Sequence, residues 1–192
     1  MTEAQLTLRK SLTRHLRAGH PWVYRDAVEE ACGQAGDVIT LVDRQGSFVA
    51  RGLLEAGPIA VRVLTVVDEP IGRAFFARRI RKAFELRAFL DFGDTTAYRL
   101  IHGEGDRIPG FVLDRYNEYA VLRCDGDAST RRAPEFIDAL VPELDRIGVS
   151  NLVLKTGRGR EALASVVHGD APPDRLEVRE RGMRLHASLL KG

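Results

Sequence analysis

The sequence predicts an α+β fold in which a small β-rich domain precedes a second, small α+β domain. Two observations support this class. Short strand-like segments separated by turn residues fill 36–65, and a helical period follows over 71–91 before short strand-like segments return. A chain of 192 residues is long enough to hold two small domains. We therefore divide it into 1–72, a connecting helix over 73–93, and 94–192.

The first domain begins with the alternating residues 6–8, which are typical of a strand with one buried face. Lys10, Arg14 and Arg17 then recur at a spacing that places cations near one face of a helix over 10–17. Extended segments are expected at 22–24, 37–42, 47–53 and 59–65. Short strands at this spacing favour a compact barrel of about 70 residues.

The segment 71–91 is predicted to be an amphipathic helix that closes this barrel and belongs mainly to the first domain. We expect its buried face to include Leu86 and Leu90. The opposite face carries the cations Arg78, Arg81 and Lys82.

The second domain is expected to contain three strands, a helix and further strands. The strands fall at 98–101, 110–113 and 119–123, with another at 149–155 and a pair within 176–187 around Arg181 and Gly182. The helix is expected to begin at about Pro134. Pro142 should kink or split it, because proline removes a helical N–H donor and clashes with the preceding turn.

The composition excludes several classes of protein. The chain has no run of about 20 apolar residues that would cross a bilayer, and its first residues have no apolar core of a secretory signal. Its two cysteines, Cys32 and Cys124, form no CxxC pair, which argues against a zinc or redox motif and favours a reducing compartment. We therefore expect a cytoplasmic protein that has no membrane partner.

The charge is unevenly distributed along the chain, although its net value is only +2. Residues 1–25 carry five Lys or Arg against one acid, and 72–93 carry six against two. Between them, 26–71 carries three bases against eight acids. Two basic blocks therefore flank an acidic one, a pattern that fits either an anionic partner or ordinary variation in solvated faces.

The segment 14–24, with the sequence RHLRAGHPWVY, combines a cationic helix, a glycine turn and an aromatic residue. Such a surface can hold RNA, since arginines bind phosphates and Trp22 or Tyr24 offers a stacking face. The alternative is that Trp22 is the main aromatic residue of the barrel core. The candidate RNA-binding residues are Lys10, Arg14, Arg17, His20, Trp22 and Arg25.

The segment 99–116, with the sequence RLIHGEGDRIPGFVLDRY, contains three residues of types that bind metals: His102, Glu104 and Asp106. Glycines separate them, and no further His or Cys stands at ligand spacing. We expect no metal site here. A tight turn between two strands, with Asp106 and Gly110 supplying the turn chemistry, explains these residues better.

Taken together, GHPWVY and the later AYRLIHGEGDRIPGFVLDRY resemble the bacterial SAM-dependent 23S rRNA (cytosine-C5) methyltransferases, and the resemblance spans the chain. It implies an N-terminal PUA domain, which is an RNA-binding pseudobarrel, followed by a central α+β domain. It also implies ribosomal RNA as partner and a Rossmann-like methyltransferase domain that binds S-adenosylmethionine.

That third domain has no counterpart in the sequence. No strand is followed by GxGxxG, since the segment 157–160, GRGR, lacks the third glycine. Neither Cys32 nor Cys124 has the setting of the nucleophile that C5 methylation requires. We therefore expect no catalytic residue and no bound cofactor in this chain. The alternatives are a freestanding RNA-binding adaptor and a structural module whose second domain forms a homodimer.

Overall fold

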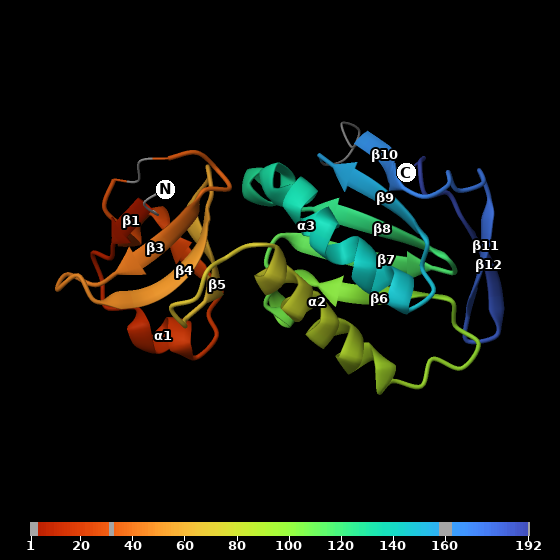
Figure 1. Cartoon of the computed structure of the whole chain (residues 1–192), viewed down its shortest axis with the longest axis horizontal. Coiled ribbons are helices and arrows are strands. Elements are labelled where there is room, and N and C mark those ends of the chain that lie inside the picture. Colours follow the sequence, from red (N-terminus) through yellow and green to blue (C-terminus); the bar gives the residue numbers. More distant parts are fainter. Residues whose placement is uncertain (1–3, 31–32, 158–162, 192) are drawn as a thin grey trace.

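Two five-stranded sheets, joined by one helix, organise the molecule (Figure 1). The computed structural model describes residues 4–30, 33–157 and 163–191. The α+β class expected from the sequence is confirmed, since both sheets contain parallel and antiparallel strand pairs and helices pack beside them. Among the helices that the structure describes, none is long and apolar enough to cross a membrane.

The first sheet has the strand order β1-β3-β4-β5-β2. Its strands are β1 (Ala4–Thr7), β2 (Trp22–Tyr24), β3 (Val38–Val42), β4 (Phe48–Leu54) and β5 (Ile59–Thr65), and the short helix α1 (Thr13–Arg17) and the 3-10 turn η1 (Arg25–Ala27) lie beside it. Within the described residues the sheet is open, with β1 and β2 as its edges. An isolated bridge between Leu8 and Val28 links the segments that follow these two edge strands.

Glycine at position 52 lets β4 and β5 approach closely. A Cβ atom on Gly52 would lie 2.2 Å from the carbonyl oxygen of Arg62, a distance that real side chains do not reach. The register between the two strands also shifts between Arg51 and Gly52. This close approach matters because Arg62 lies at the centre of the polar network described below.

The second sheet has the order β10-β9-β8-β7-β6. Its strands are β6 (Ala97–His102), β7 (Phe111–Tyr116), β8 (Tyr119–Cys124), β9 (Asn151–Thr156) and β10 (Leu163–His168). Both faces are covered, as the alternation along β8 shows. Ala120 and Leu122 belong to a core shared with the helices, whereas Tyr119 and Val121 pack with the hairpin of β11 (Leu176–Glu180) and β12 (Met183–Ala187).

Helix α2 (Arg73–Ala88) packs mainly on α3 and on strand β6 of the second sheet, although Leu53 and Leu64 of the first sheet belong to the same buried cluster. Phe76 contacts the rings of Phe111 and Phe136, at centroid separations of 6.0 Å and 5.3 Å. The expectation that this helix closes the first barrel is therefore wrong. The amphipathic period identified an apolar face correctly, but a period does not say which sheet covers that face.

The expected limits of the apolar face were also too wide. Leu86 and Leu90 were placed on it, yet they are 52% and 57% exposed. Leu90 lies beyond the last helical residue, so it does not share the helix period. The three cations on the opposite face, Arg78, Arg81 and Lys82, are exposed as expected.

Helix α3 (Asp127–Arg146) begins seven residues before Pro134 and runs unsplit through both prolines. The expected start at Pro134 and a split at Pro142 are therefore wrong. A proline inside a helix costs about 3 kcal/mol, and burial of apolar side chains such as Phe136, Leu140 and Leu144 offsets that cost. Tertiary packing thus overrides the local preference.

Three further strands, β10, β11 and β12, test what the sequence predicted for the C-terminal part. The hairpin turn at Arg181 and Gly182 is confirmed, with φ of 48° and 83°, the positive values that a tight two-residue hairpin requires. Strand β10, antiparallel to β9, was not expected. Its residues LASVVH include two adjacent β-branched valines, which is the local signal for a strand.

Candidate nucleic-acid interface

Helix α1 presents two arginines to solvent. Leu16 is 3% exposed and anchors the helix on the first core, whereas Arg14 and Arg17 are exposed. Within residues 4–30, 33–157 and 163–191, neither arginine side chain forms a hydrogen bond or an ion pair. These cations are therefore available to an anionic partner.

Lys10 does not belong to this helix, contrary to the sequence expectation. The helix begins at Thr13, and the Lys10 ammonium lies 2.7 Å from Asp26. This hydrogen bond and charge lower the pKa of Asp26. Both side chains are exposed, so the pair is screened by solvent and contributes little stability. The shared cationic face predicted for Lys10, Arg14 and Arg17 thus reduces to the two arginines.

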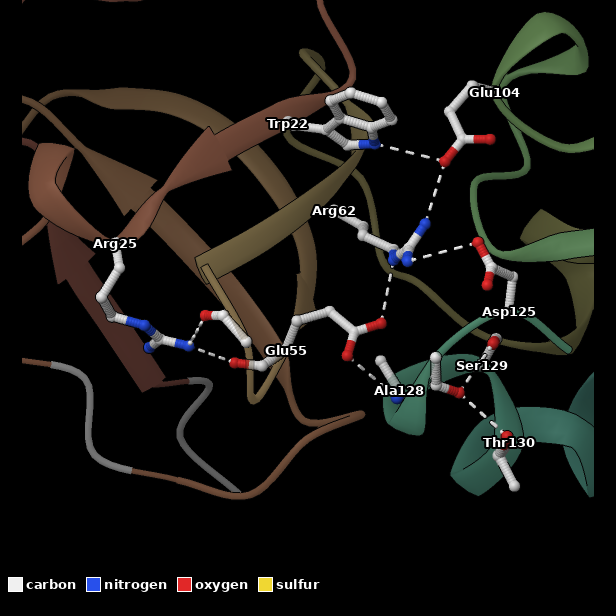
Figure 2. A network of polar contacts seen from close by, with 11 residues as sticks. Trp22, Arg25, Glu55, Arg62, Glu104, Asp125, Ala128, Ser129 and Thr130 are labelled. Atoms are coloured by element: carbon white, nitrogen blue, oxygen red, sulfur yellow. Dashed lines mark hydrogen bonds and ion pairs between the residues drawn. The ribbon is translucent and has the colours of Figure 1, made fainter. Parts of the chain in front are cut away.

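Arg25 directly follows strand β2 and holds a turn of the first domain (Figure 2). Its guanidinium donates to the carbonyl oxygens of Glu55 and Gly57. These contacts tie η1 to the β4–β5 connection. Arg25 is thus engaged with the protein's own backbone in this structure.

Trp22 lies at the junction between the two sheets and is half-buried. Its indole N–H donates to Oε1 of Glu104 at 3.2 Å, across 82 positions of sequence. The exposed His20 packs edge-on against the indole, with ring centroids 6.3 Å apart. The interpretation of Trp22 as the main aromatic residue of the barrel core is wrong, because Trp22 is only half-buried and does not belong to the buried cluster of the first sheet.

Arg62 connects the two halves of the chain (Figure 2). Its guanidinium donates to Glu55 Oε1 at 2.9 Å and to Glu104 Oε1 at 2.9 Å. A third acid, Asp125, lies 3.8 Å away. The side chains of Arg62 and Glu55 are only 9% and 7% exposed. A buried, multiply paired arginine of this kind orients the surfaces that it joins.

Sequence reasoning missed Arg62 and Glu55. A signal for Arg62 was present, since a lone arginine interrupts the apolar strand IAVRVLT. A charge at such a position needs a buried partner. The identity of that partner depends on how the chain folds back.

The acids of the segment 99–116 are committed to ion pairs. Asp106 pairs with both terminal nitrogens of Arg87, at 2.6 Å and 2.7 Å, and accepts the backbone N–H of His102 at 2.6 Å. Glu104 binds Arg62 and Trp22. The turn interpretation is confirmed by the 3-10 turn η2 (Gly103–Asp106) and by Gly110 at φ +87°. In the part of the chain that the structure describes, no cluster of His, Cys, Asp or Glu has the form of a metal site.

The two cysteines differ in what the structure says of them. Cys124 is buried in the second core, and burial raises the pKa of its thiol to about 12. A thiol with such a pKa supplies almost no thiolate near neutral pH. Cys32 lies outside the described residues, as does the 158–160 part of the GRGR segment.

A cavity of about 130 Å³ opens between α1, the end of β5, α2 and η2. Arg17 and His20 line it from the first domain, and Arg79 and Arg107 line it from the second. No residue of the second domain was among the sequence candidates. The cavity adds Arg79 and Arg107 to the basic groups near α1.

Comparisons with known proteins agree with a PUA-like domain in the first part of the chain. Residues 6–66 match the PUA-like domain family. The chain is 35% identical to ribosomal RNA large subunit methyltransferase I of Cronobacter sakazakii over 196 aligned positions, covering 98% of this chain and 50% of that protein. It is 36% identical to the protein of the same name from an Enterobacter species, with the same coverage. The chain thus spans about half the length of these curated relatives.

Two solved structures share the fold. A Streptococcus mutans protein assigned as a SAM-dependent methyltransferase matches with a TM-score of 0.83 at 16% identity, over 98% of this chain and 49% of that chain. A second protein assigned as a methyltransferase, solved in complex with SAH, also has a TM-score of 0.83 at 16% identity, over 100% and 49%. At this identity the likeness concerns the arrangement of helices and strands.

Proposed function

We propose that this chain is the RNA-binding part of a SAM-dependent methyltransferase that modifies carbon 5 of a cytosine in large-subunit ribosomal RNA. Its role is to dock the RNA, while methyl transfer and S-adenosylmethionine binding belong to a separate catalytic domain. The observation that carries this proposal is the PUA-like match at 6–66 within a chain that aligns over 98% of its length with ribosomal RNA large subunit methyltransferases.

The exposed arginines of α1 are the main phosphate-binding groups in this proposal. Arg14 and Arg17 stand on the PUA-like domain with their guanidinium groups uncommitted within the described chain. Lys10 joins them by exchanging Asp26 for a phosphate, which costs little because that ion pair is exposed. His20 lies beside Arg17 at the cavity. Trp22 and Arg25 position this surface through their contacts with Glu104 and the β4–β5 turn.

We also infer that the first domain adopts the closed pseudobarrel fold that is typical of PUA domains. The bridge between Leu8 and Val28, together with the bond from the Arg9 N–H to the Ala27 carbonyl oxygen at 2.8 Å, supports this closure. The pairs lie next to α1, so closure would hold the helix in place on the barrel.

The test measures how RNA affinity depends on salt. Fluorescence anisotropy with a labelled single-stranded RNA should give a log–log slope of about −0.7 for each phosphate that the protein neutralises. Replacing Arg14 and Arg17 together with Ala should flatten this slope by about 1.4 if each binds its own phosphate. The melting temperature should hardly change, because exposed cations contribute little to stability.

A matched control removes the same charge elsewhere. Arg175 and Arg184 are exposed residues at and near the β11–β12 hairpin, at the opposite end of the molecule from α1 (Figure 1). The double change Arg175→Ala and Arg184→Ala should leave the salt slope unchanged. Equal slopes for the wild type and the Arg14/Arg17 variant would remove α1 from the interface, and absence of RNA binding by the wild type would refute the proposed function.

A further inference from the structure

The cavity between α1 and η2 is unusual in the balance of charges that line it. Four basic residues line it: Arg17, His20, Arg79 and Arg107. Two acids, Glu69 and Glu104, also line it. The charge that a ligand would meet therefore depends on whether the acids are already neutralised by other partners.

Both acids are engaged within the protein. Glu69 pairs with Arg78 and accepts the Thr65 hydroxyl at 2.9 Å. Glu104 accepts a hydrogen bond from Arg62 at 2.9 Å and another from the Trp22 indole at 3.2 Å. Both carboxylates are thus shared with partners outside the cavity, although the charge of Glu69 also acts on Arg79.

The basic groups are less well compensated. In the described part of the chain, the side chains of Arg17 and Arg107 make no hydrogen bond or ion pair. Arg79 donates to the Leu64 carbonyl oxygen at 3.3 Å and lies 5.1 Å from the centroid of the Phe75 ring. Burial lowers the pKa of Arg79, Glu69 opposes this, and the charges of Arg107 and Arg78 lower the pKa further. An anion in the cavity would offset the repulsion between Arg79 and its neighbours Arg78 and Arg107.

Arg107 is held in a strained backbone conformation. Its φ of 58° and ψ of 35° lie in the left-handed region, which is unfavourable for a residue with a Cβ atom. Hydrogen bonds maintain this geometry, since the Arg107 N–H donates to the Glu104 carbonyl oxygen at 3.1 Å and the Ile108 N–H donates to that of Gly103 at 2.9 Å. The tight turn thus keeps Arg107 at the cavity wall.

We propose that this cavity binds one phosphate group of the RNA backbone, held between Arg17 and His20 of the PUA-like domain and Arg79 and Arg107 of the second domain. This inference rests on the proposed function. At about 130 Å³ the cavity is well below the roughly 300 Å³ at which pockets for drug-sized ligands begin, so it suits a phosphate group and not a whole nucleotide. RNA would then cross the junction of the two domains and contact both.

The test compares Arg17→Gln, Arg107→Asn and the double variant, using the full chain and the same labelled RNA. Asparagine is chosen at position 107 because it tolerates the left-handed conformation. Each single change should weaken RNA binding by about tenfold or more, as expected for loss of a charge-assisted hydrogen bond. Because both arginines hold one phosphate, the double variant should flatten the salt slope by only about 0.7, and not by the 1.4 expected for two phosphates. Arg175→Gln is the control, and it should leave both affinity and slope unchanged.

A chemical substitution identifies the source of the phosphate. A series of RNAs is made in which one neutral methylphosphonate replaces the phosphate at each position in turn. At one position this replacement should weaken binding to the wild type. At that position it should not weaken binding to the Arg17/Arg107 double variant, which already lacks the groups that hold the phosphate. Inorganic phosphate should compete only at much higher concentration. If it raises the melting temperature of the wild type while the variants keep full RNA affinity, the cavity is an anion site unrelated to RNA and the inference fails.

The outcomes also separate this inference from the proposed function. If the Arg14/Arg17 variant loses RNA affinity while Arg107→Asn binds as the wild type does, α1 binds RNA but the cavity does not. If the wild type binds no RNA, the proposed function itself fails. Circular dichroism of Arg107→Asn confirms that the variant is folded before its affinity is compared.

Discussion

Replacing Arg62 with Met should destabilise the protein strongly, because it removes the guanidinium that neutralises a buried carboxylate. Glu55 is 7% exposed and accepts a hydrogen bond from Arg62 at 2.9 Å. Its other oxygen lies 3.5 Å from the Ala128 N–H, which is too long to compensate fully for a lost ion pair. Loss of one partner from a buried pair costs about 3–5 kcal/mol.

That cost corresponds to a large shift in melting temperature. For a chain of 192 residues, each kcal/mol lowers the melting temperature by about 2–4 °C, so Arg62→Met should lower it by roughly 6–20 °C. Urea unfolding followed by circular dichroism gives the change in free energy directly. Fluorescence of Trp22, the single tryptophan of the chain, reports on the same junction.

Two further variants show whether the unpaired Glu55 carboxylate causes the loss of stability. The double change Glu55→Met and Arg62→Met replaces the pair with apolar side chains of similar length and should recover most of the lost stability. Arg123→Met is the control, since Arg123 is 54% exposed and lies 3.3 Å from Asp114, so its loss should cost less than about 1 kcal/mol. A loss below about 1 kcal/mol for Arg62→Met, or no recovery in the double variant, would refute the reasoning.

Three further predictions follow from other parts of the structure and sequence. Calorimetric titration of this chain with S-adenosylmethionine should show no saturable binding, and micromolar binding would contradict the assignment of the cofactor to a separate domain. Cys124 should resist iodoacetamide in the native protein and react on unfolding, because burial raises the pKa of its thiol to about 12. Peptide mapping distinguishes its labelling from that of Cys32. Rapid labelling of Cys124 in the native protein would contradict its burial. The pKa of Glu143 lies below its ordinary value of 4.5, and the hydrogen bond from Arg81 is the largest cause. The wild type should therefore be more stable than Glu143→Gln at neutral pH and should lose that advantage as the pH falls below about 4.5. A stability difference that is independent of pH would show that ionisation of Glu143 is not involved.

The local sequence was sufficient for much of the fold. The short apolar run over 59–65 predicted β5, the helical period predicted α2, and Arg181 with Gly182 predicted the turn of the β11–β12 hairpin. These features are local because strand and helix periods depend on neighbouring residues, and a hairpin turn depends on two. The likeness of the segments GHPWVY and AYRLIHGEGDRIPGFVLDRY to ribosomal RNA methyltransferases also came from the sequence alone, and the comparisons agree with it.

Tertiary structure decided which surfaces meet. The period of α2 could not say that the helix packs on the second sheet, since any apolar face of suitable shape would bury it. Local preference also failed at Pro134 and Pro142, where burial of the α3 face outweighs the cost of proline. In these cases the deciding free energy comes from residues that are distant in sequence.

The candidate site depends on such long-range contacts even more strongly. The sequence identified Arg14 and Arg17 as available cations, because their local spacing and composition are sufficient for that. The roles of Trp22 and Arg62 depend on Glu104, which lies 82 and 42 positions away. A hydrogen bond or an ion pair requires atoms within a few ångströms, and only the folded chain brings these residues together.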